Sequence, residues 1–112
     1  MKKICFDLDG VICSNTNGDY ENAVPFQKAI NKINKLYNEG FYILIFTARF
    51  MGRNKDDVVA ANKLGFSFTT NQLKKWGLKY HKLIIGKPEF DIVIDDKSLN
   101  YDETWIELDF NK

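Results

Sequence analysis

Apolar residues along the chain fall into short continuous stretches separated by longer segments with helical spacing. The continuous stretches cover residues 4–6, 41–46, 82–85 and 90–94, and they are rich in β-branched and aromatic side chains. Stretches of this length and composition predict buried β-strands. Residues 105–110 alternate between apolar and polar side chains, a pattern compatible with a last strand at the edge of a sheet.

Segments with helical spacing lie between these strands. Pro25 fits the first turn of a helix, and apolar residues then recur every three or four positions until Gly40. Residues 54–64 predict a second, shorter helix that ends at Gly65, and residues 71–76 predict a third. This order predicts βαβ units. We therefore expect a three-layer, Rossmann-like α/β sandwich with a mainly parallel sheet, in which strand 41–46 is covered on both faces.

Length and composition limit the classes of function. A chain of 112 residues suffices for one domain, which we expect to span residues 1–112. Sixteen basic and fifteen acidic residues leave a net charge of +1, too little to attract nucleic acid or an anionic membrane. The longest apolar stretch is too short for a membrane span, and the first residues lack a signal-peptide pattern, so we expect a cytoplasmic protein. The two cysteines, Cys5 and Cys13, fit neither a redox pair nor a zinc site, and a structural role is favoured for both.

Two aspartates follow the first predicted strand directly. Asp7 and Asp9 are two positions apart, so in an extended chain their side chains point to the same side. Gly10 allows a sharp turn that leaves both carboxylates at the rim of the sheet. Two like charges this close repel each other unless a cation lies between them or one carboxylate holds a proton. The alternative is a purely structural strand end, because acidic residues followed by glycine commonly begin turns.

The other predicted strands also end in residues that chemistry can use. These residues are Thr47, Ala48 and Arg49 after the second strand, Lys87 after the third, and Asp95 and Asp96 after the fourth. The carboxyl ends of parallel strands share one rim, where open α/β sheets bind ligands. Carboxylates suit Mg²⁺, whereas a hydroxyl, backbone amides and an ammonium suit phosphate oxygens. One carboxylate of the first pair is then free to attack phosphorus and form an aspartyl-phosphate.

The segments DLDG, FTAR, GKP and IDD, in this order and at these strand ends, resemble the four motifs of the haloacid dehalogenase superfamily of phosphatases. The resemblance covers nearly the whole chain. It implies a phosphomonoester hydrolase in which Asp7 is the nucleophile and Asp9 is the general acid and base. It further implies that Thr47 and the amide of Ala48 hold the phosphoryl group, while Lys87 neutralises its charge and orients the nucleophile.

The resemblance also implies a cofactor, Mg²⁺. Its ligands would be Asp7, the backbone carbonyl of Asp9, and either Asp95 or Asp96, with Asp95 favoured. Arg49 has two readings, because it either binds substrate phosphate or a carboxylate, or only pairs with a surface acid. The single histidine precedes a predicted strand, away from the expected rim, and a structural role is favoured for it.

Many members of the superfamily carry a cap domain, and this chain has no room for one. Only one loop and one helix separate the turn at Asp9 from the second strand. A capless site is open, which fits large substrates or a homo-oligomer whose neighbouring subunit covers the site. Residues 13–23 correspond to the small flap of the superfamily. Short capless members with this order of motifs look like the phosphatases of surface (capsular) polysaccharide biosynthesis, which implies a phosphorylated sugar or sugar-linked alcohol as substrate.

Other functions on a similar fold remain alternatives. A signalling receiver domain also combines acids, a threonine, a lysine and Mg²⁺, but its phosphorylated aspartate would follow a middle strand, where this chain has Thr47. Its lysine would also follow the acidic pair, whereas Lys87 precedes Asp95 and Asp96. An inactive binding protein is disfavoured because no motif residue is missing. A phosphotransferase or nucleotide phosphatase also fits the motifs, although transfer usually requires a cap that excludes water.

Overall fold

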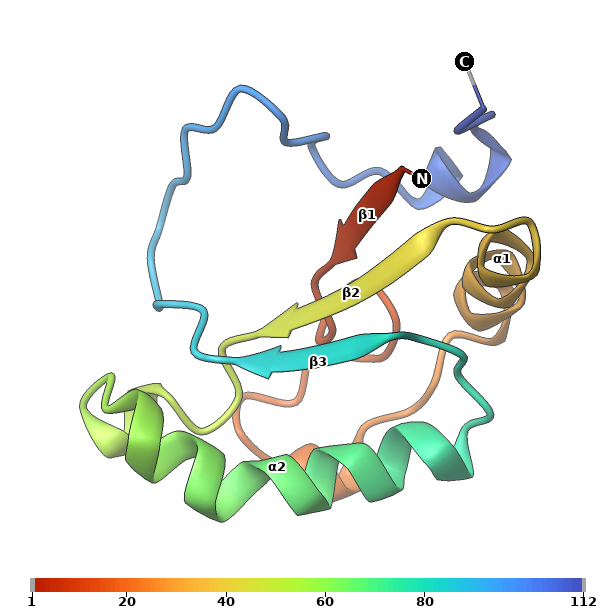
Figure 1. Cartoon of the computed structure of the whole chain (residues 1–112). Helices are drawn as coiled ribbons and strands as arrows, with labels where there is room; N and C mark the ends of the chain where they lie inside the picture. Colours follow the sequence, from red (N-terminus) through yellow and green to blue (C-terminus); the bar gives the residue numbers. More distant parts are fainter. Residues whose placement is uncertain (1, 112) are drawn as a thin grey trace.

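A computed structural model describes residues 2–111 of the chain. Three parallel strands form one sheet in the order β1-β2-β3 (Figure 1). The elements are β1 (Lys3–Phe6), α1 (Gln27–Asn38), β2 (Tyr42–Thr47), α2 (Val58–Lys75) and β3 (Lys82–Ile85), with short 3-10 helices η1 (Tyr20–Asn22), η2 (Gly52–Asn54) and η3 (Glu103–Glu107). The βαβαβ order confirms the predicted α/β class. No helix among the described residues is long and apolar enough to cross a membrane.

Both long helices pack against the same face of the sheet. The strand register pairs Phe6 with Ile45 and Ile45 with Leu83, so these three side chains share one face. They belong to one buried core together with Ile33 of α1 and Leu73 of α2. Right-handed crossovers that step in the same direction across a sheet place their helices on one side. The arrangement of the two βαβ units therefore follows from the strand order.

The opposite face of the sheet remains partly open. Cys5 of β1 is exposed, and Leu44, Phe46 and Ile84 are only half-buried. The expectation that the second strand is covered on both faces is therefore wrong for the described part of one chain. Because both crossovers place their helices on the other face, residues 2–111 build two layers rather than three. Parallel sheets are normally covered on both faces, so this open face requires an explanation.

The region between β2 and β3 also differs from the sequence prediction. In place of two helices at 54–64 and 71–76, the chain forms one helix, α2, of 18 residues. The side chain of Asp57 caps this helix, accepting hydrogen bonds from the backbone N–H groups of Val59 and Ala60. From the sequence, Gly65 was expected to end the helix predicted at residues 54–64. In the structure, Gly65 is a buried interior position, and its small size serves packing.

Gly65 makes room for the ring of Phe50, and a Cβ at this position would overlap that ring. Phe50 has a φ of 68°, which lies in the left-handed region that bulky residues rarely adopt. Gly65→Ala should therefore lower the free energy of unfolding by about 1–3 kcal/mol. We expect this loss even though alanine is a better helix former than glycine by about 1 kcal/mol. Urea denaturation measures the change, with Ser67→Ala at an exposed position of α2 as the control.

A more stable Gly65→Ala variant would show that Phe50 does not occupy the space beside α2. Ser67→Ala should be neutral or slightly stabilising, because its side chain faces solvent and alanine is the better helix former. The contrast between the two variants separates the effect of packing from the effect of helix propensity.

The fourth predicted strand, residues 90–94, does not form. We name residues 88–101 the arm. Figure 1 shows it in blue, arcing away from β1 before the chain returns to η3. Ile92 and Ile94 are 81% and 97% exposed. A β-favouring sequence becomes a strand only when another strand pairs with it, and no strand among residues 2–111 pairs with the arm. Full burial of one isoleucine contributes about 1.5–3 kcal/mol, so this exposure is costly.

The segment after the arm folds back onto β1 and α1. Residues 105–110 do not form the edge strand that their alternation suggested. Instead Trp105 lies in η3, and its ring packs against Phe6 with the centroids 5.2 Å apart. Lys32 of α1 donates a hydrogen bond to the carbonyl of Leu108 at 2.9 Å. These contacts bury Trp105 in the core and fix the far end of the arm.

Candidate active site

Three of the predicted site residues meet at the carboxyl edge of the sheet. Asp7 directly follows β1, Thr47 ends β2, and Lys87 follows β3. Since the three strands are parallel neighbours, these positions share one rim. The Nζ atom of Lys87 is 3.3 Å from Oδ2 of Asp7. The structure thus brings a carboxylate and an ammonium together from opposite edges of the sheet.

Asp7 and Lys87 line an open hollow of about 520 Å³ together with Ala48. The remaining lining residues are Pro88, Glu89, Phe90 and Asp91 at the start of the arm. The side chain of Asp7 is 39% exposed, and its Oδ1 accepts a hydrogen bond from the N–H of Leu8 at 2.8 Å. One carboxylate oxygen is therefore oriented by the backbone, while the other faces the ammonium. This geometry places a partly exposed carboxylate next to a positive charge.

Thr47 supports the rim from within. It is buried, and its Oγ1 accepts a hydrogen bond from the N–H of Arg49 at 3.1 Å. Its carbonyl oxygen accepts hydrogen bonds from the N–H groups of Gly86 and Lys87, both at 3.2 Å. These bonds tie the end of β3 to the end of β2 and so position the lysine. Ala48, next in the chain, lines the hollow where the resemblance expects a phosphate-binding amide.

Asp9 is held by Arg49 through a two-pronged ion pair. Nε of Arg49 donates to Oδ2 of Asp9 and Nη2 donates to Oδ1, both at 2.9 Å. The side chain of Arg49 is completely buried, while that of Asp9 is 16% exposed. Such a fork between guanidinium and carboxylate fixes the direction of both groups. Of the two readings of Arg49, direct contact with substrate does not fit this arrangement, because its guanidinium is buried against an acid.

Two residues that the sequence analysis did not select complete the surroundings of Arg49. Nη1 donates to Oε1 of Gln72 at 2.6 Å, and the guanidinium lies over the ring of Tyr20, 4.7 Å from the centroid. Gln72 in turn donates to the carbonyl of Tyr20 at 2.8 Å. The flap, residues 13–23, is thereby pinned to α2 through Arg49. No sequence pattern marks Gln72, because its role depends on α2 being one continuous helix.

Cys13 lies next to the same ion pair. Its Sγ atom is 3.4 Å from Oδ1 of Asp9, and Nη2 of Arg49 is 3.6 Å from Sγ. Burial, and after it the charge of Asp9, raises the pKa of the Cys13 thiol to about 12, against an opposing effect of Arg49. The side chain therefore stays a neutral thiol near pH 7 and is no nucleophile. This agrees with the structural role predicted for it.

Asp95 and Asp96 lie on the exposed arm, and neither has a contact with Asp7 or Asp9 among the described residues. Oδ1 of Asp95 instead accepts a hydrogen bond from the N–H of Lys97 at 2.9 Å within a local turn. Within residues 2–111, no three side chains of histidine, cysteine, aspartate or glutamate come together as a metal-binding set. The expected magnesium ligands are therefore not assembled by one chain.

His81 lies away from the rim, as predicted. Its ring is stacked between Tyr37 and Tyr42, with both centroid distances at 4.5 Å, and its Nδ1 accepts a hydrogen bond from the N–H of Ile43 at 3.0 Å.

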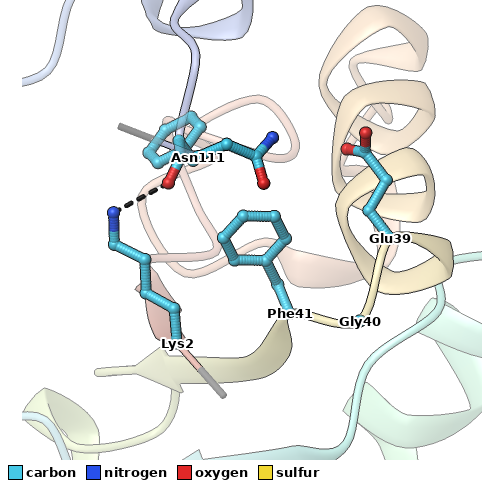
Figure 2. A pocket seen from close by; sticks show the side chains of 6 residues that line it. Lys2, Glu39, Gly40, Phe41 and Asn111 are labelled. Carbon is cyan, nitrogen blue, oxygen red and sulfur yellow. Dashed lines mark hydrogen bonds between the residues drawn. The ribbon is translucent and has the colours of Figure 1, made fainter.

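A second hollow, of about 290 Å³, lies at the opposite end of the sheet, before β1 and β2 begin (Figure 2). It is lined by Lys2, Glu39, Gly40, Phe41, Phe110 and Asn111. There Lys2 donates to the carbonyl of Phe110 at 2.7 Å, a contact that holds the end of the chain.

The fold is consistent with a Rossmann-like α/β protein, and a hollow lies at the carboxyl ends of its strands. Open α/β sheets bind ligands at this edge. Its overall structure is similar to a crystal structure of a protein from Vibrio cholerae, described there only as a structural target. The TM-score is 0.87 at 28% sequence identity, and the match covers 99% of this chain and 92% of the other. No family model and no curated protein matches the chain.

Proposed function

We propose that this protein is a phosphomonoester hydrolase that works through an aspartyl-phosphate on Asp7. The observation that carries the proposal is the partly exposed carboxylate of Asp7, 3.3 Å from the ammonium of Lys87, in a hollow at the common rim of three parallel strands. The resemblance of the four segments to the haloacid dehalogenase superfamily supports the same assignment. A positive charge beside the nucleophile attracts the phosphate dianion and stabilises the charge of its transition state.

The proposed reaction has two steps. First, an oxygen of Asp7 forms a bond to phosphorus while the bond to the ester oxygen breaks, and the departing alkoxide takes a proton from Asp9. Second, water loses a proton to Asp9 and attacks the same phosphorus, which releases inorganic phosphate and restores Asp7. Lys87 and the backbone amide of Ala48 contact the phosphoryl oxygens in both steps.

Asp9 has a constraint in this scheme. Both of its oxygens receive N–H groups from Arg49, so donating a proton to a leaving group requires the pair to loosen when substrate fills the hollow. Arg49 acts here as a positioning residue, because it touches Asp9 rather than the reacting atoms. The pair turns the proposed general acid in a defined direction before substrate binds.

A phosphorylated sugar or a sugar-linked alcohol is the proposed substrate class. The hollow is open, and no cap covers it among residues 2–111, so a bulky alcohol portion has space outside the rim. A panel of sugar phosphates, nucleotides and an aryl phosphate, assayed for phosphate release with and without Mg²⁺, tests the function. If the protein releases phosphate from none of these substrates, the proposed function is wrong. Labelling by a phosphoryl donor without turnover would point to the receiver-type alternative.

Mg²⁺ remains the proposed cofactor, and a single chain does not provide its complete site. Asp7 offers one carboxylate at the hollow, the carboxylate of Asp9 is engaged by Arg49, and Asp95 and Asp96 are on the arm. Mg²⁺ favours octahedral oxygen ligands, usually one or two carboxylates with several waters. The carboxylates expected from the fourth strand are thus missing from the rim.

Substrates with different leaving groups test whether Asp9 acts as the general acid. An alkoxide needs a proton in the transition state, and a positioned acid contributes about 10²–10⁴-fold, whereas an aryl oxide needs much less help. Asp9→Asn should therefore slow sugar phosphates by this factor and leave the first step with an aryl phosphate much less affected. Since water also loses its base, the aspartyl-phosphate should accumulate with both substrates. Rapid-quench kinetics measures the burst and the trapped phosphoenzyme.

The matched control is Asp19→Asn, an isosteric change at an exposed position of the flap, which should leave both rates unchanged. If Asp9→Asn slows both substrates equally and traps no phosphoenzyme, Asp9 has no acid–base role. The loss would then come from the site geometry that its pairing with Arg49 maintains.

A further inference from the structure

The arm exposes an apolar strand sequence in a chain that otherwise buries such sequences. Phe90, Ile92, Val93 and Ile94 are 47%, 81%, 54% and 97% exposed. Contiguous exposed apolar residues in a soluble protein mark a surface that contacts something else. Both ends of the arm are fixed, at Lys87 through its backbone hydrogen bond to Thr47 and at Trp105 through its burial in the core. Between these two points, every residue of the arm is exposed in the described chain.

The edge of β1 offers the pairing that the arm lacks. β1 ends the sheet in the order β1-β2-β3, and no backbone hydrogen bond among residues 2–111 reaches its outer side. The face of the sheet that carries Cys5 and Leu44 is also partly open. An unpaired edge of this kind is a template for another strand.

The arm cannot reach this edge in its own chain as a parallel strand. Its connection from β3 is only residues 86–89, whereas parallel strands need a crossover of about a dozen residues or more. The backbone of Lys87 is bonded to Thr47 at the end of β2. From there the chain would have to cross two strand spacings and run back along β1, a straight distance of about 19 Å. The four peptide steps to Asp91 span at most about 14 Å.

We infer that the arm of a second copy of this chain pairs with β1 as the fourth strand of its sheet, in a two-fold symmetric dimer that exchanges arms. The short connection does not restrict pairing with a second copy, because the arm of that copy approaches β1 from outside. The sequences match in a parallel register that sets Ile92 beside Ile4 and Ile94 beside Phe6. The same register sets the acidic Asp91 beside the exposed Lys3, so both apolar residues and charges are complementary.

This register also brings Asp95 of the second copy level with Asp7 at the rim. The two carboxylates from different chains would then supply the oxygen ligands that one chain does not assemble. This part of the inference rests on the proposed function, whereas the dimer itself does not. Each active site of the dimer would combine Asp7, Thr47 and Lys87 of one copy with Asp95 or Asp96 of the other. The near-neutral net charge of +1 per chain does not oppose the association.

A disulfide test distinguishes exchange from closure within one chain. The register places position 93 beside the native Cys5, so Val93→Cys should form a disulfide between two chains under mild oxidation. A covalent dimer on a non-reducing gel is the expected result, and it should disappear when Cys5→Ser is added. Cys13 does not compete because it is buried. Partial desolvation raises the pKa of the Cys5 thiol, so the oxidation is run in mildly alkaline buffer.

The control is Leu99→Cys, an exposed position on the same arm but outside the pairing segment, which should give little dimer. An intrachain disulfide at Val93→Cys, or a monomer in sedimentation at micromolar concentration, would overturn the inference. Ile92→Ser with Ile94→Ser should convert a dimer to a monomer without unfolding it, because both side chains are exposed in the single chain. Leu99→Ser should leave the dimer intact, and equal effects of these variants would also contradict the pairing.

Mixed dimers test the shared active site. Asp7→Asn and Asp95→Asn copies, carrying different tags and produced together, are each expected to be inactive alone. In an exchanged mixed dimer, one site combines the intact Asp7 of one copy with the intact Asp95 of the other. Random pairing should therefore restore about a quarter of the wild-type activity, because half of the dimers are mixed and each has one intact site.

If each site belonged to one chain, every site in the mixture would lack one aspartate and no activity would return. That result, with a wild type that hydrolyses phosphate esters, overturns the shared site. A wild type with no phosphatase activity contradicts the proposed function instead, while the disulfide and sedimentation results still decide the exchange of arms.

Discussion

Asp7→Asn is expected to abolish phosphatase activity and to leave the fold unchanged. An amide oxygen does not attack phosphorus as a carboxylate does, and loss of a covalent nucleophile typically costs about 10⁴–10⁶-fold in rate. The fold should tolerate the change because the side chain is partly exposed and its oxygen still accepts the hydrogen bond from the N–H of Leu8. The ion pair with Lys87 is lost, but a partly exposed pair contributes little to stability.

Steady-state turnover of an aryl phosphate, together with far-UV circular dichroism and urea denaturation, measures the effect. Asp109→Asn is the matched control, since Asp109 also accepts a backbone hydrogen bond, from Asn111, but lies far from the rim in the chain. Near-normal turnover by Asp7→Asn would contradict the assignment of the nucleophile. Equal losses in both variants would point to the assay rather than to the site.

Arg49→Met is expected to cause the largest loss of stability among single substitutions near the rim. Removing one partner of a buried ion pair leaves the other charge without compensation, which typically costs about 3–5 kcal/mol. Here the carboxylate of Asp9 would lose both N–H donors, and Gln72 would lose its partner as well. The flap would also lose the contact between the guanidinium and Tyr20.

Urea denaturation of Arg49→Met should be compared with Arg53→Met. Arg53 is exposed and also contacts the ring of Tyr20, so its loss should cost much less. Arg49→Lys should recover only part of the stability, because an ammonium keeps the charge but not the planar fork. If Arg49→Met and Arg53→Met were equally stable, the buried pair with Asp9 would not be a main support of the rim.

The sequence predicted the three strands of the sheet and the part of the rim that they form, because both depend on local patterns. Short β-rich stretches ending in polar residues placed Asp7, Thr47 and Lys87 at the ends of adjacent strands, and the structure brings them together. The amphipathic spacing from Pro25 to Gly40 likewise located α1. These features follow from side-chain periodicity, which the sequence displays directly.

Tertiary packing decided the features that the sequence analysis got wrong or left open. Gly65 was taken as a helix end, but contact with Phe50 makes it an interior position of one long helix. The two readings of Arg49 were equal in sequence, and only burial beside Asp9 separates them. Residues 90–94 have the composition of a strand, yet a strand requires hydrogen bonds from a neighbour. Whether residues 90–94 form a strand depends on whether they can reach the edge of a neighbouring strand. The connections between elements in three dimensions decide this, and the local sequence does not show it.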